Sequence, residues 1–359
     1  MNKNFYILKN GKLIRKYNTI YFIYQKQEEN NKVFKAEIDE EEFDVETENI
    51  ANKLEYEKRI LPIEQIGNLF LYGRVSLTSG VISLLCKKSI PVHFFGYYGN
   101  YEGSIIPKES LLSGKMHINQ AAHYLDYRKR ILLARKFIEG ASLNMLRNLK
   151  YYQSEGRDFE SKIEYIENEI KKITNIIDIN KLRALEGGIR NKYYACFDVI
   201  IKNTFKFEKR TKQPPLNPIN AMISFGNALL YSTIIKNIYH TQLNQTIAFL
   251  HEPSERRYSL SLDLSEIFKP LIVDRVIFKL TNKQIITEKH FVKELNSCLL
   301  NEKGKKIFVM EYEKKLNSTI KHRSLKRNVS YERLIYLECI KLCKHLLGMK
   351  KYEPFVIWW

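Results

Sequence analysis

The sequence predicts an α+β protein in which an N-terminal β-rich domain is followed by a larger, all-helical domain. Roughly the first hundred residues hold short runs of β-branched and aromatic residues separated by turn signals. Beyond residues 107–114, almost every stretch has apolar residues spaced three or four apart, as an amphipathic helix requires. Strands that precede a run of helices are typical of an α+β arrangement or of two separate domains. We therefore expect domains over residues 1–110 and 111–359.

The β-rich domain is expected to begin with two hairpins. Asn10-Gly11 lies between the apolar runs 5–8 and 13–14, and this dipeptide is a strong signal for a two-residue turn. The second hairpin joins residues 21–24 to residues 33–36. The other elements predicted for this domain are one short helix over 78–87 and strands over 59–62, 68–71 and 92–95.

The second domain is predicted from helical periodicity throughout. Apolar stripes predict helices over residues 121–150, 159–173 and 185–197. Asn217-Pro218 predicts the start of another helix, because Asn is a favoured N-cap and Pro is tolerated in the first turn. A final amphipathic helix is expected over 331–347.

Charge is the strongest compositional signal. The 359 residues include 59 Lys and Arg but only 40 Asp and Glu, which gives a net charge of +19. Because the segment Glu37–Glu48 holds eight acids and no basic residue, the remainder of the chain carries +27. Such an excess indicates a polyanionic partner, either nucleic acid or an acidic membrane face. A coding bias towards Lys is the alternative explanation.

The cysteines and the apolar content indicate the compartment. Cys86, Cys196, Cys298, Cys339 and Cys343 are scattered and include no CxxC pair, so we expect free thiols in a reduced cytoplasm. The start of the chain lacks the features of a signal peptide, and no apolar stretch reaches the ~18 residues of a membrane span. We therefore expect a cytoplasmic protein that does not associate with a membrane.

Three places put polar groups where the periodicity predicts burial. The first is Glu186, which adjoins an apolar helical stripe and is followed by Gly187 and Gly188. Two glycines inside a helix cost roughly 1 kcal/mol each relative to Ala, so the pair suggests close approach of another backbone or of a ligand. The alternative is a surface glutamate paired with Arg190, which lies four residues later on the same face.

The second and third places are close to each other in the sequence. His251 ends the apolar run 247–250, where either a ligand or a hydrogen-bonded structural imidazole fits. Asp263 and Glu266 are three residues apart and so share one helix face. Two acids there repel each other unless a cation or a base lies between them. The alternative is a first helical turn whose acids favour the helix dipole.

Together these residues suggest a metal site. Carboxylates with one imidazole form an oxygen-and-nitrogen donor set that suits Mg²⁺ or Mn²⁺. In a protein of charge +19, such a site indicates phosphodiester chemistry, in which the ion neutralises charge on the transferring phosphoryl group. The chain has no GxSxG motif, no Walker loop and no GxGxxG after a strand, so acyl transfer, NTP hydrolysis and dinucleotide binding lack support.

The order and spacing of several segments resemble the CRISPR-associated adaptation endonuclease and integrase family, the larger subunit of the spacer-acquisition complex. The resemblance covers nearly the whole chain, and it implies that residues 1–110 form a dimerisation domain and residues 111–359 a catalytic domain. It rests on the segments Gly67–Gly73, Ile90–Phe95, Gly103–Pro107, Ala184–Gly187, Asn217–Ala221, Leu250–His251, Ser259–Pro270 and Tyr352–Phe355.

The resemblance also implies which residues form the active site. Glu186, His251 and Glu266 match the ligands of a catalytic Mg²⁺ or Mn²⁺, and Asp263 matches a further acid near the metal. The family usually has Arg where this chain has Lys269, which keeps the charge but loses bidentate phosphate geometry. Near these motifs lie the candidates for contacts with DNA phosphates, each with a solvated surface cation as the alternative: Arg190, Lys192, Arg256, Arg257 and Lys269.

The implied reaction is transesterification, in which the 3′-hydroxyl of a short DNA fragment attacks a phosphodiester at the repeat boundary of a CRISPR array. The implied partners are double-stranded DNA (protospacer and CRISPR repeat), a second copy of the chain and a small ferredoxin-like subunit. Two other functions fit the same residues. One is a general metal-dependent nuclease that acts on branched DNA or RNA, and the other is a non-catalytic basic DNA-binding scaffold.

Overall fold

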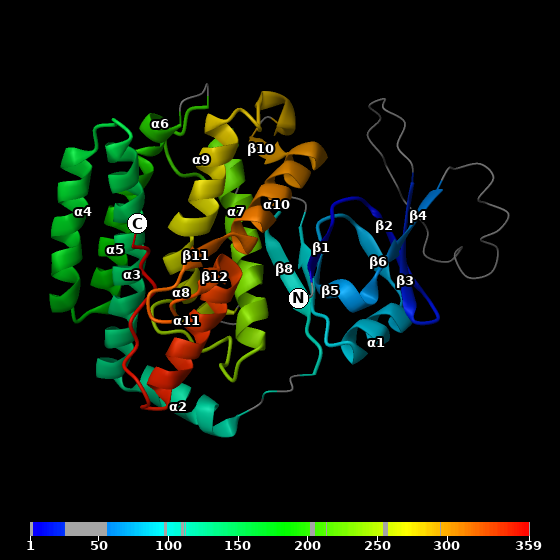
Figure 1. The fold of residues 1–359 in the computed structure, drawn as a ribbon, viewed down its shortest axis with the longest axis horizontal. Helices are drawn as coiled ribbons and strands as arrows, with labels where there is room; N and C mark the ends of the chain where they lie inside the picture. The colour runs from blue at the N-terminus through cyan, green and yellow to red at the C-terminus, as the bar shows by residue number, and fades with distance from the viewer. Residues whose placement is uncertain are drawn as a thin grey trace. The chain divides into compact units, whose positions relative to one another are not determined.

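The chain forms two compact units, Met1–Tyr97 with Tyr101–Lys108, and Tyr98–Asn100 with Glu109–Trp359. The first unit contains the strands β1 to β8 and the second is mostly helical, so the predicted separation of strands from helices is confirmed (Figure 1). The computed structural model describes residues 3–25, 56–96, 99–108, 111, 113–201, 205–212, 214–253, 258–294 and 296–358.

Two four-stranded sheets make up most of the first unit. One has the order β1-β5-β7-β8, in which only the last pair is antiparallel, and the other has the order β4-β3-β2-β6. The helix predicted over 78–87 is confirmed as α1 (Ser79–Lys87), which begins after Thr78, and the Thr78 hydroxyl accepts from the Val81 amide. The strand bounds are β1 Lys3–Ile7, β2 Gly11–Lys16, β3 Thr19–Gln25, β4 Tyr56–Leu61, β5 Ile66–Leu71, β6 Val75–Leu77, β7 Val92–Phe95 and β8 Tyr101–Ile105.

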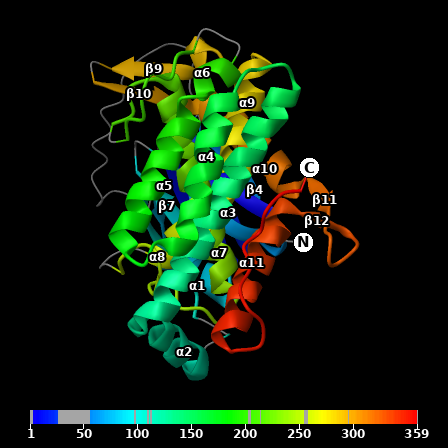
Figure 2. The same cartoon turned by 90° about the vertical axis from the view of Figure 1, so that its left-hand side faces the viewer.

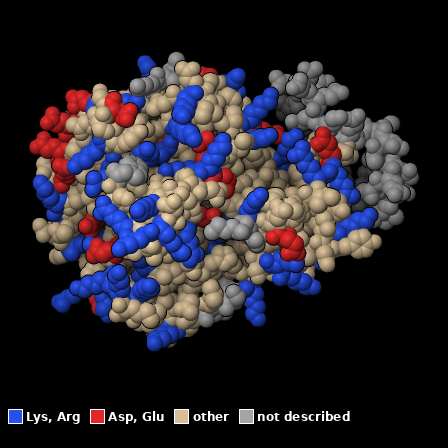
Figure 3. Space-filling model, viewed as in Figure 1, with Lys and Arg blue, Asp and Glu red and all other residues tan. Residues whose placement is uncertain are grey.

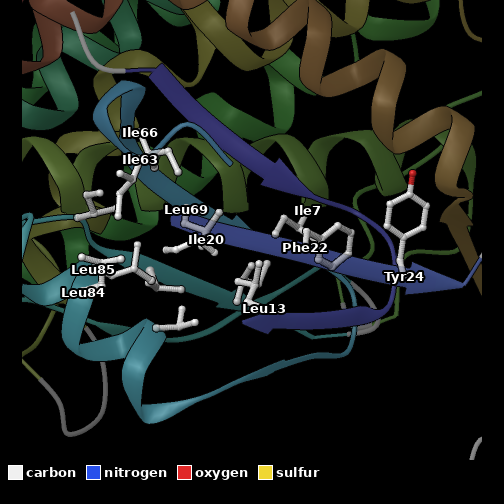
Figure 4. Close-up of a cluster of buried hydrophobic side chains, with 14 residues drawn as sticks. Ile7, Leu13, Ile20, Phe22, Tyr24, Ile63, Ile66, Leu69, Leu84 and Leu85 are labelled. Carbon is white, nitrogen blue, oxygen red and sulfur yellow. The ribbon is translucent and has the colours of Figure 1, made fainter. Parts of the chain in front are cut away.

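Side chains from both sheets and from α1 share one apolar core (Figure 4). Along β3, Ile20, Phe22 and Tyr24 are buried while the intervening side chains are half-buried, which is the alternation expected of a strand with one face on a core. Leu69 on β5 and Leu85 on α1 contribute from the other elements and are fully buried. The β-branched and aromatic runs of the sequence therefore correspond to the inner faces of these strands.

The predicted hairpin at Asn10-Gly11 is wrong. β1 pairs with β5 and β2 pairs with β3 and β6, so the two strands flanking the dipeptide belong to different sheets. Asn10 and Gly11 instead pair with Arg74: the Asn10 side chain accepts from the Arg74 amide at 2.8 Å, and the Gly11 amide donates to the Arg74 carbonyl at 3.0 Å. A Cβ atom at position 11 would lie 2.3 Å from the Ile23 carbonyl oxygen. Glycine is therefore needed where these two backbone segments approach each other closely.

The second predicted hairpin is only partly within the described residues. Residues 21–24 form part of β3 as expected, but residues 33–36 and the acidic stretch 37–48 lie outside the described part of the chain. β3 pairs with β2 and β4 in an antiparallel manner. The short strands β6 and β8 were not predicted, because neither carries a long β-branched run.

The second unit is a helical assembly with two small β-ribbons. α3, α4 and α5 lie side by side (Figure 2). The ribbons pair β9 (Phe291–Glu294) with β10 (Ser297–Leu300) and β11 (Thr319–Lys321) with β12 (Asn328–Ser330), so this unit is not purely helical. Its helices are α2 Gly114–Leu125, α3 Tyr127–Ser154, α4 Glu160–Lys172, α5 Ile179–Tyr194, α6 Phe197–Ile200, α7 Pro218–Tyr239, α8 Ser259–Phe268, the π-helix η3 Pro270–Asp274, α9 Arg275–Asn282, α10 Glu302–Asn317 and α11 Tyr331–Leu346.

The helix predicted over 121–150 is in fact two helices. Asp126 separates α2 from α3, and its carboxylate accepts from the amides of Arg128 and Lys129 as an N-cap. Leu125, an apolar residue within the predicted helix, is 80% exposed next to this break. The apolar periodicity continues across residue 126, but the N-cap at Asp126 ends one helix and begins the next.

Two other sequence-based expectations agree with the structure. The Asn217 side chain accepts from the Asn220 amide at 2.8 Å and begins α7, as predicted. The five cysteines are free, and Cys339 is fully buried on α11. Among the residues that the structure describes, no helix is both long and apolar enough to cross a membrane.

We expect Gly11→Ala to destabilise the protein by about 1–3 kcal/mol, because the added methyl group would overlap a backbone oxygen in a packed sheet. Gly103→Ala is the matched control, since nothing lies within 4 Å of its added methyl group, and it should change stability by less than about 0.5 kcal/mol. Urea unfolding of both variants measures the difference. Equal stabilities would contradict the close backbone passage at Gly11.

Candidate active site

A half-buried ion network joins two of the predicted glutamates. Glu186 lies on α5 and Glu266 on α8, and Arg190 of α5 contacts both: its Nε donates to Glu186 Oε1 at 2.6 Å and its other arm donates to Glu266 Oε2. Lys269 Nζ donates to the second oxygen of Glu266 at 2.7 Å. The structure thus brings together residues that are 80 positions apart in the sequence and compensates their charges internally.

His251 is held by Asp263, which is fully buried on α8. Asp263 Oδ2 accepts from the amides of Phe249 and Leu250 at 2.7 and 3.0 Å, and Oδ1 accepts from the His251 amide at 3.0 Å. His251 Nδ1 lies 2.8 Å from the same Oδ1. An Nδ1–H that donates there leaves the lone pair on Nε2, which is the arrangement of a histidine ligand oriented by a carboxylate. Asp263 therefore supports His251.

Glu266 is ionised at neutral pH despite its burial. Burial by itself raises the pKa of this carboxyl, but the charges of Arg190, Lys269 and His251 outweigh it and lower the pKa to about 2. The effect of His251 also indicates that the imidazole lies within electrostatic reach of Glu266. Arg190 is affected in the opposite sense: burial lowers its pKa, but Glu266 and Glu186 raise it well above the usual value.

A further acid, Asp274, was missed in the sequence. It ends the π-helix η3, is 3% exposed, and shares a hydrogen bond with the hydroxyl of Tyr193 on α5. Burial raises its pKa from 3.8 to about 7, although Arg190, Tyr193 and Lys269 lower it. The available signal was an acid at the end of the apolar run Leu271–Val273, where an unpaired surface residue would not be expected.

Glu186, His251 and Glu266 have the donor chemistry of a Mg²⁺ or Mn²⁺ site. Two carboxylates and an imidazole with Nε2 available suit these ions, and both glutamates already face a positive group, Arg190. Within the described ranges no three His, Cys, Asp or Glu side chains surround a common point as metal ligands do. The residue types therefore suit the ion, and the ligand set itself stays a prediction.

The predicted DNA contacts differ in their surroundings. Arg190 and Lys269 are engaged in the ion pairs with glutamate, and Arg256 and Arg257 lie outside the described residues. Lys192 is exposed on α5, with its Nζ 5.3 Å from the ring centroid of Tyr165. Figure 3 shows many Lys and Arg side chains over the face of the helical unit, with acidic side chains gathered at the edge formed by α4.

The two glycines after Glu186 do not serve the approach of another backbone. A side chain at Gly187 would meet nothing within 4 Å, and one at Gly188 would meet only the Tyr165 hydroxyl at 3.4 Å. The expectation of a packed backbone there is wrong. The alternative offered by the sequence, a Glu186 paired with Arg190 four residues later, is observed, with Arg190 Nε 2.6 Å from Glu186 Oε1. The open space at Gly187 also leaves room for a ligand beside Glu186.

Asp274→Asn should make the protein more stable at pH 8 than the wild type, with a smaller gain at pH 5. Asp274 binds a proton more tightly in the folded state than in the unfolded chain, so its contribution to stability is lost as the pH rises from about 4 to about 7. The variant cannot ionise and should avoid this loss, which we expect to exceed about 1 kcal/mol between the two pH values. Urea unfolding at both pH values measures the difference, and a gain independent of pH would contradict it.

Comparison with known proteins identifies the family. The family model described as CRISPR associated protein Cas1 matches residues 5–314. A CRISPR-associated protein Cas1 from Methanobrevibacter ruminantium is 50% identical over 357 residues, which is 99% of this chain and 99% of the relative. A CRISPR-associated endonuclease Cas1 from Fusobacterium nucleatum is 42% identical over 359 residues, 100% of this chain and 98% of the relative.

Solved structures agree with this assignment. The structure of a Cas1 protein from Thermotoga maritima has a TM-score of 0.80 and 34% identity, and the match covers 98% of this chain and 100% of that one. A casposase bound to an integration product has the same fold, with a TM-score of 0.82 at 20% identity over 98% of this chain and 92% of that one. With a family model that matches most of its length and close relatives that match nearly all of it, this chain belongs to the CRISPR-associated Cas1 family.

Proposed function

We propose that this protein is a metal-dependent DNA endonuclease and integrase that inserts short DNA fragments, as new spacers, into a CRISPR array. The observation that carries the proposal is the ion-pair network of Glu186, Arg190, Glu266 and Lys269, with His251, which Asp263 orients, within electrostatic reach of Glu266. Relatives that are 42% identical are named endonucleases, which supports the cutting step. The casposase of similar fold is bound to an integration product, which supports the joining step by analogy.

The residues of the candidate active site have separate roles in the proposed reaction. Glu186, Glu266 and His251 would hold Mg²⁺ or Mn²⁺, and the bound ion supplies positive charge that stabilises the charge developing on the attacked phosphate. Asp263 keeps His251 in the orientation that exposes Nε2. Lys269 and Arg190 keep Glu266 ionised, so that its carboxylate is available as a ligand at neutral pH.

The proposed reaction is a balanced exchange of phosphodiesters. The 3′-oxygen of the incoming fragment forms a bond to phosphorus, and the bond between that phosphorus and the 3′-oxygen of the repeat strand breaks. The attacking hydroxyl loses its proton, and the leaving 3′-oxygen gains one. Because the number of phosphodiester bonds is unchanged, no nucleoside triphosphate is required.

The proposed partners are double-stranded DNA, a second copy of the chain and a small ferredoxin-like subunit. The net charge of +19 supports a polyanionic partner. A solved complex of Cas6-RT-Cas1 with Cas2 contains a chain of this fold, with a TM-score of 0.79 at 15% identity over 100% of this chain and 36% of that one. We propose an analogous association here.

The general nuclease is the second candidate, since the relatives' name refers to cutting alone. The two functions differ in their product. A nuclease releases cleaved strands only, whereas an integrase also forms a branched joint between the fragment and the repeat. A half-site assay with labelled fragment and target duplex therefore separates them.

We expect Glu186→Gln and His251→Ala each to lower the rate of half-site joining by at least about 100-fold in Mg²⁺ or Mn²⁺, because each removes a proposed ligand. Chelation with EDTA should abolish joining by the wild type. Glu167→Gln on α4 removes an acid that pairs with Lys150 away from the network, and it should retain the full rate. Undiminished joining in both ligand variants and in EDTA would exclude metal catalysis, and cutting without joining would favour the general nuclease.

Binding of duplex DNA without divalent metal should weaken steeply with salt, because each Lys or Arg that contacts a phosphate releases counterions. Lys192→Ala should lower the slope of log affinity against log salt by about 0.9, the value for one phosphate contact. Lys172→Ala at the acidic α4 edge, where Lys172 pairs with Glu169, should leave the slope unchanged. Fluorescence anisotropy across a salt series measures both, and a flat salt dependence would contradict a phosphate-binding surface.

A further inference from the structure

Two buried asparagines on α3 bond to the backbone that carries the active-site acid. Asn144 and Asn148 are one helical turn apart, and both are fully buried. Each uses its Nδ2 group twice as a donor. Buried amides with several hydrogen bonds fix the relative positions of the groups they join, because leaving any of these groups unpaired is costly.

Asn144 joins α8 to the C-terminal segment. Its Nδ2 donates to the carbonyls of Ile267 and Phe355, both at 3.0 Å, and its Oδ1 accepts from the Ile357 amide at 2.9 Å. Ile267 directly follows Glu266 in the sequence. The backbone of the active-site acid is thereby tied to α3 and to the segment that ends the described chain.

Asn148 joins the next turn of the same segment to α5. Its Nδ2 donates to the Pro270 carbonyl at 2.7 Å and to the Tyr193 hydroxyl at 3.0 Å. Tyr193 lies three residues after Arg190 and also shares a hydrogen bond with Asp274. One amide group therefore links the helix that carries Glu186 and Arg190 to the segment that follows Glu266 and Lys269.

The reason for these bonds is a change of helix type. The Lys269 amide donates to the Ser265 carbonyl four residues back, whereas the Asp274 amide donates to the Lys269 carbonyl five residues back. Pro270 at the transition has no amide hydrogen to donate. Such a change shifts the partners of the neighbouring carbonyls, and the Ile267 and Pro270 carbonyls accept from the two asparagines. π-Helical turns often occur at functional sites, where they aim a side chain that a regular helix would not.

We propose that Asn148, assisted by Asn144, is a positioning residue of the active site: it sets the register of the π-helical segment against α5 and so fixes the separation of Glu266 from Glu186. This inference rests on the proposed function, in which those two carboxylates act together. Neither asparagine contacts the two glutamates by a hydrogen bond, so the role is exerted through Pro270, Ile267 and Tyr193.

Asn148→Ala tests the proposal, with Thr233→Val as the matched control. Thr233 on α7 is equally buried, and its hydroxyl bonds to Leu229 and Tyr312. We expect Asn148→Ala to weaken Mn²⁺ binding 10- to 100-fold, to change the electron paramagnetic resonance spectrum of the bound Mn²⁺, and to lower kcat for joining with KM changed less than about twofold. Thr233→Val should change none of these, although both variants lose stability.

Hydrogen exchange on the metal-free protein provides a readout independent of catalysis. Asn148→Ala should accelerate amide exchange in residues 264–275 and 186–194 without a matching increase in α7, and Thr233→Val should not show this pattern. Tyr193→Phe removes only one partner of the Asn148 amide and keeps the packing, so it should show a smaller effect in the same direction if Asn148→Ala does not fold.

The outcomes separate the two proposals. If Asn148→Ala and Tyr193→Phe behave like Thr233→Val in exchange and in Mn²⁺ binding, the positioning role is overturned. A loss of joining in Glu186→Gln would then still support the proposed metal catalysis. If the wild type neither binds Mn²⁺ nor joins DNA, the proposed function fails, and the exchange pattern alone decides whether Asn148 orders the two helices.

Discussion

The contact of the Arg190 guanidinium with both Glu186 and Glu266 is the interaction on which the candidate active site depends. Two carboxylates on neighbouring helices repel each other, and burial makes each charge more costly. Arg190 donates to both, and Lys269 donates to the remaining oxygen of Glu266. Removing Arg190 would take the shared cation away from both carboxylates, so the network favours one arrangement of α5 and α8. A divalent ion placed among the same carboxylates would supply the same kind of compensation.

The residues around this network fix the orientation of the groups within it. The Asp263 carboxylate accepts hydrogen bonds from three backbone amides, those of residues 249–251, and contacts His251 Nδ1. These bonds fix both the backbone of residues 249–251 and the His251 ring. Asn148 and Asn144 do the same for the backbone beyond Glu266. A polar group that is fully buried and fully bonded has one favourable orientation, and that property converts a helical scaffold into a precise arrangement of donors.

The sequence predicted the local elements better than their pairing. The start of the helix at Pro218 was predicted from a capping residue that acts within one turn, and the helix over 78–87 was predicted from its local pattern of residues. Both agree with the structure. The hairpin at Asn10-Gly11 failed because strand pairing is decided by residues distant in the sequence, here in β5 and β6. An Asn-Gly dipeptide also cannot distinguish a hairpin turn from a connection between strands of two different sheets, since both favour glycine.

For the site, the residue types and their spacing pointed to an acid-and-histidine chemistry, and the motifs pointed to the family. Amphipathic periods also predicted the buried face of helices such as α4, where Ile163 and Ile166 are buried, because burial there follows from local spacing. Tertiary structure alone decided that Arg190 and Lys269 neutralise Glu266, that Asp263 serves His251, and that Asn148 reaches the π-helical turn. These are contacts between elements up to 122 residues apart, and electrostatics and hydrogen bonding depend on distance in space, which a linear sequence does not record.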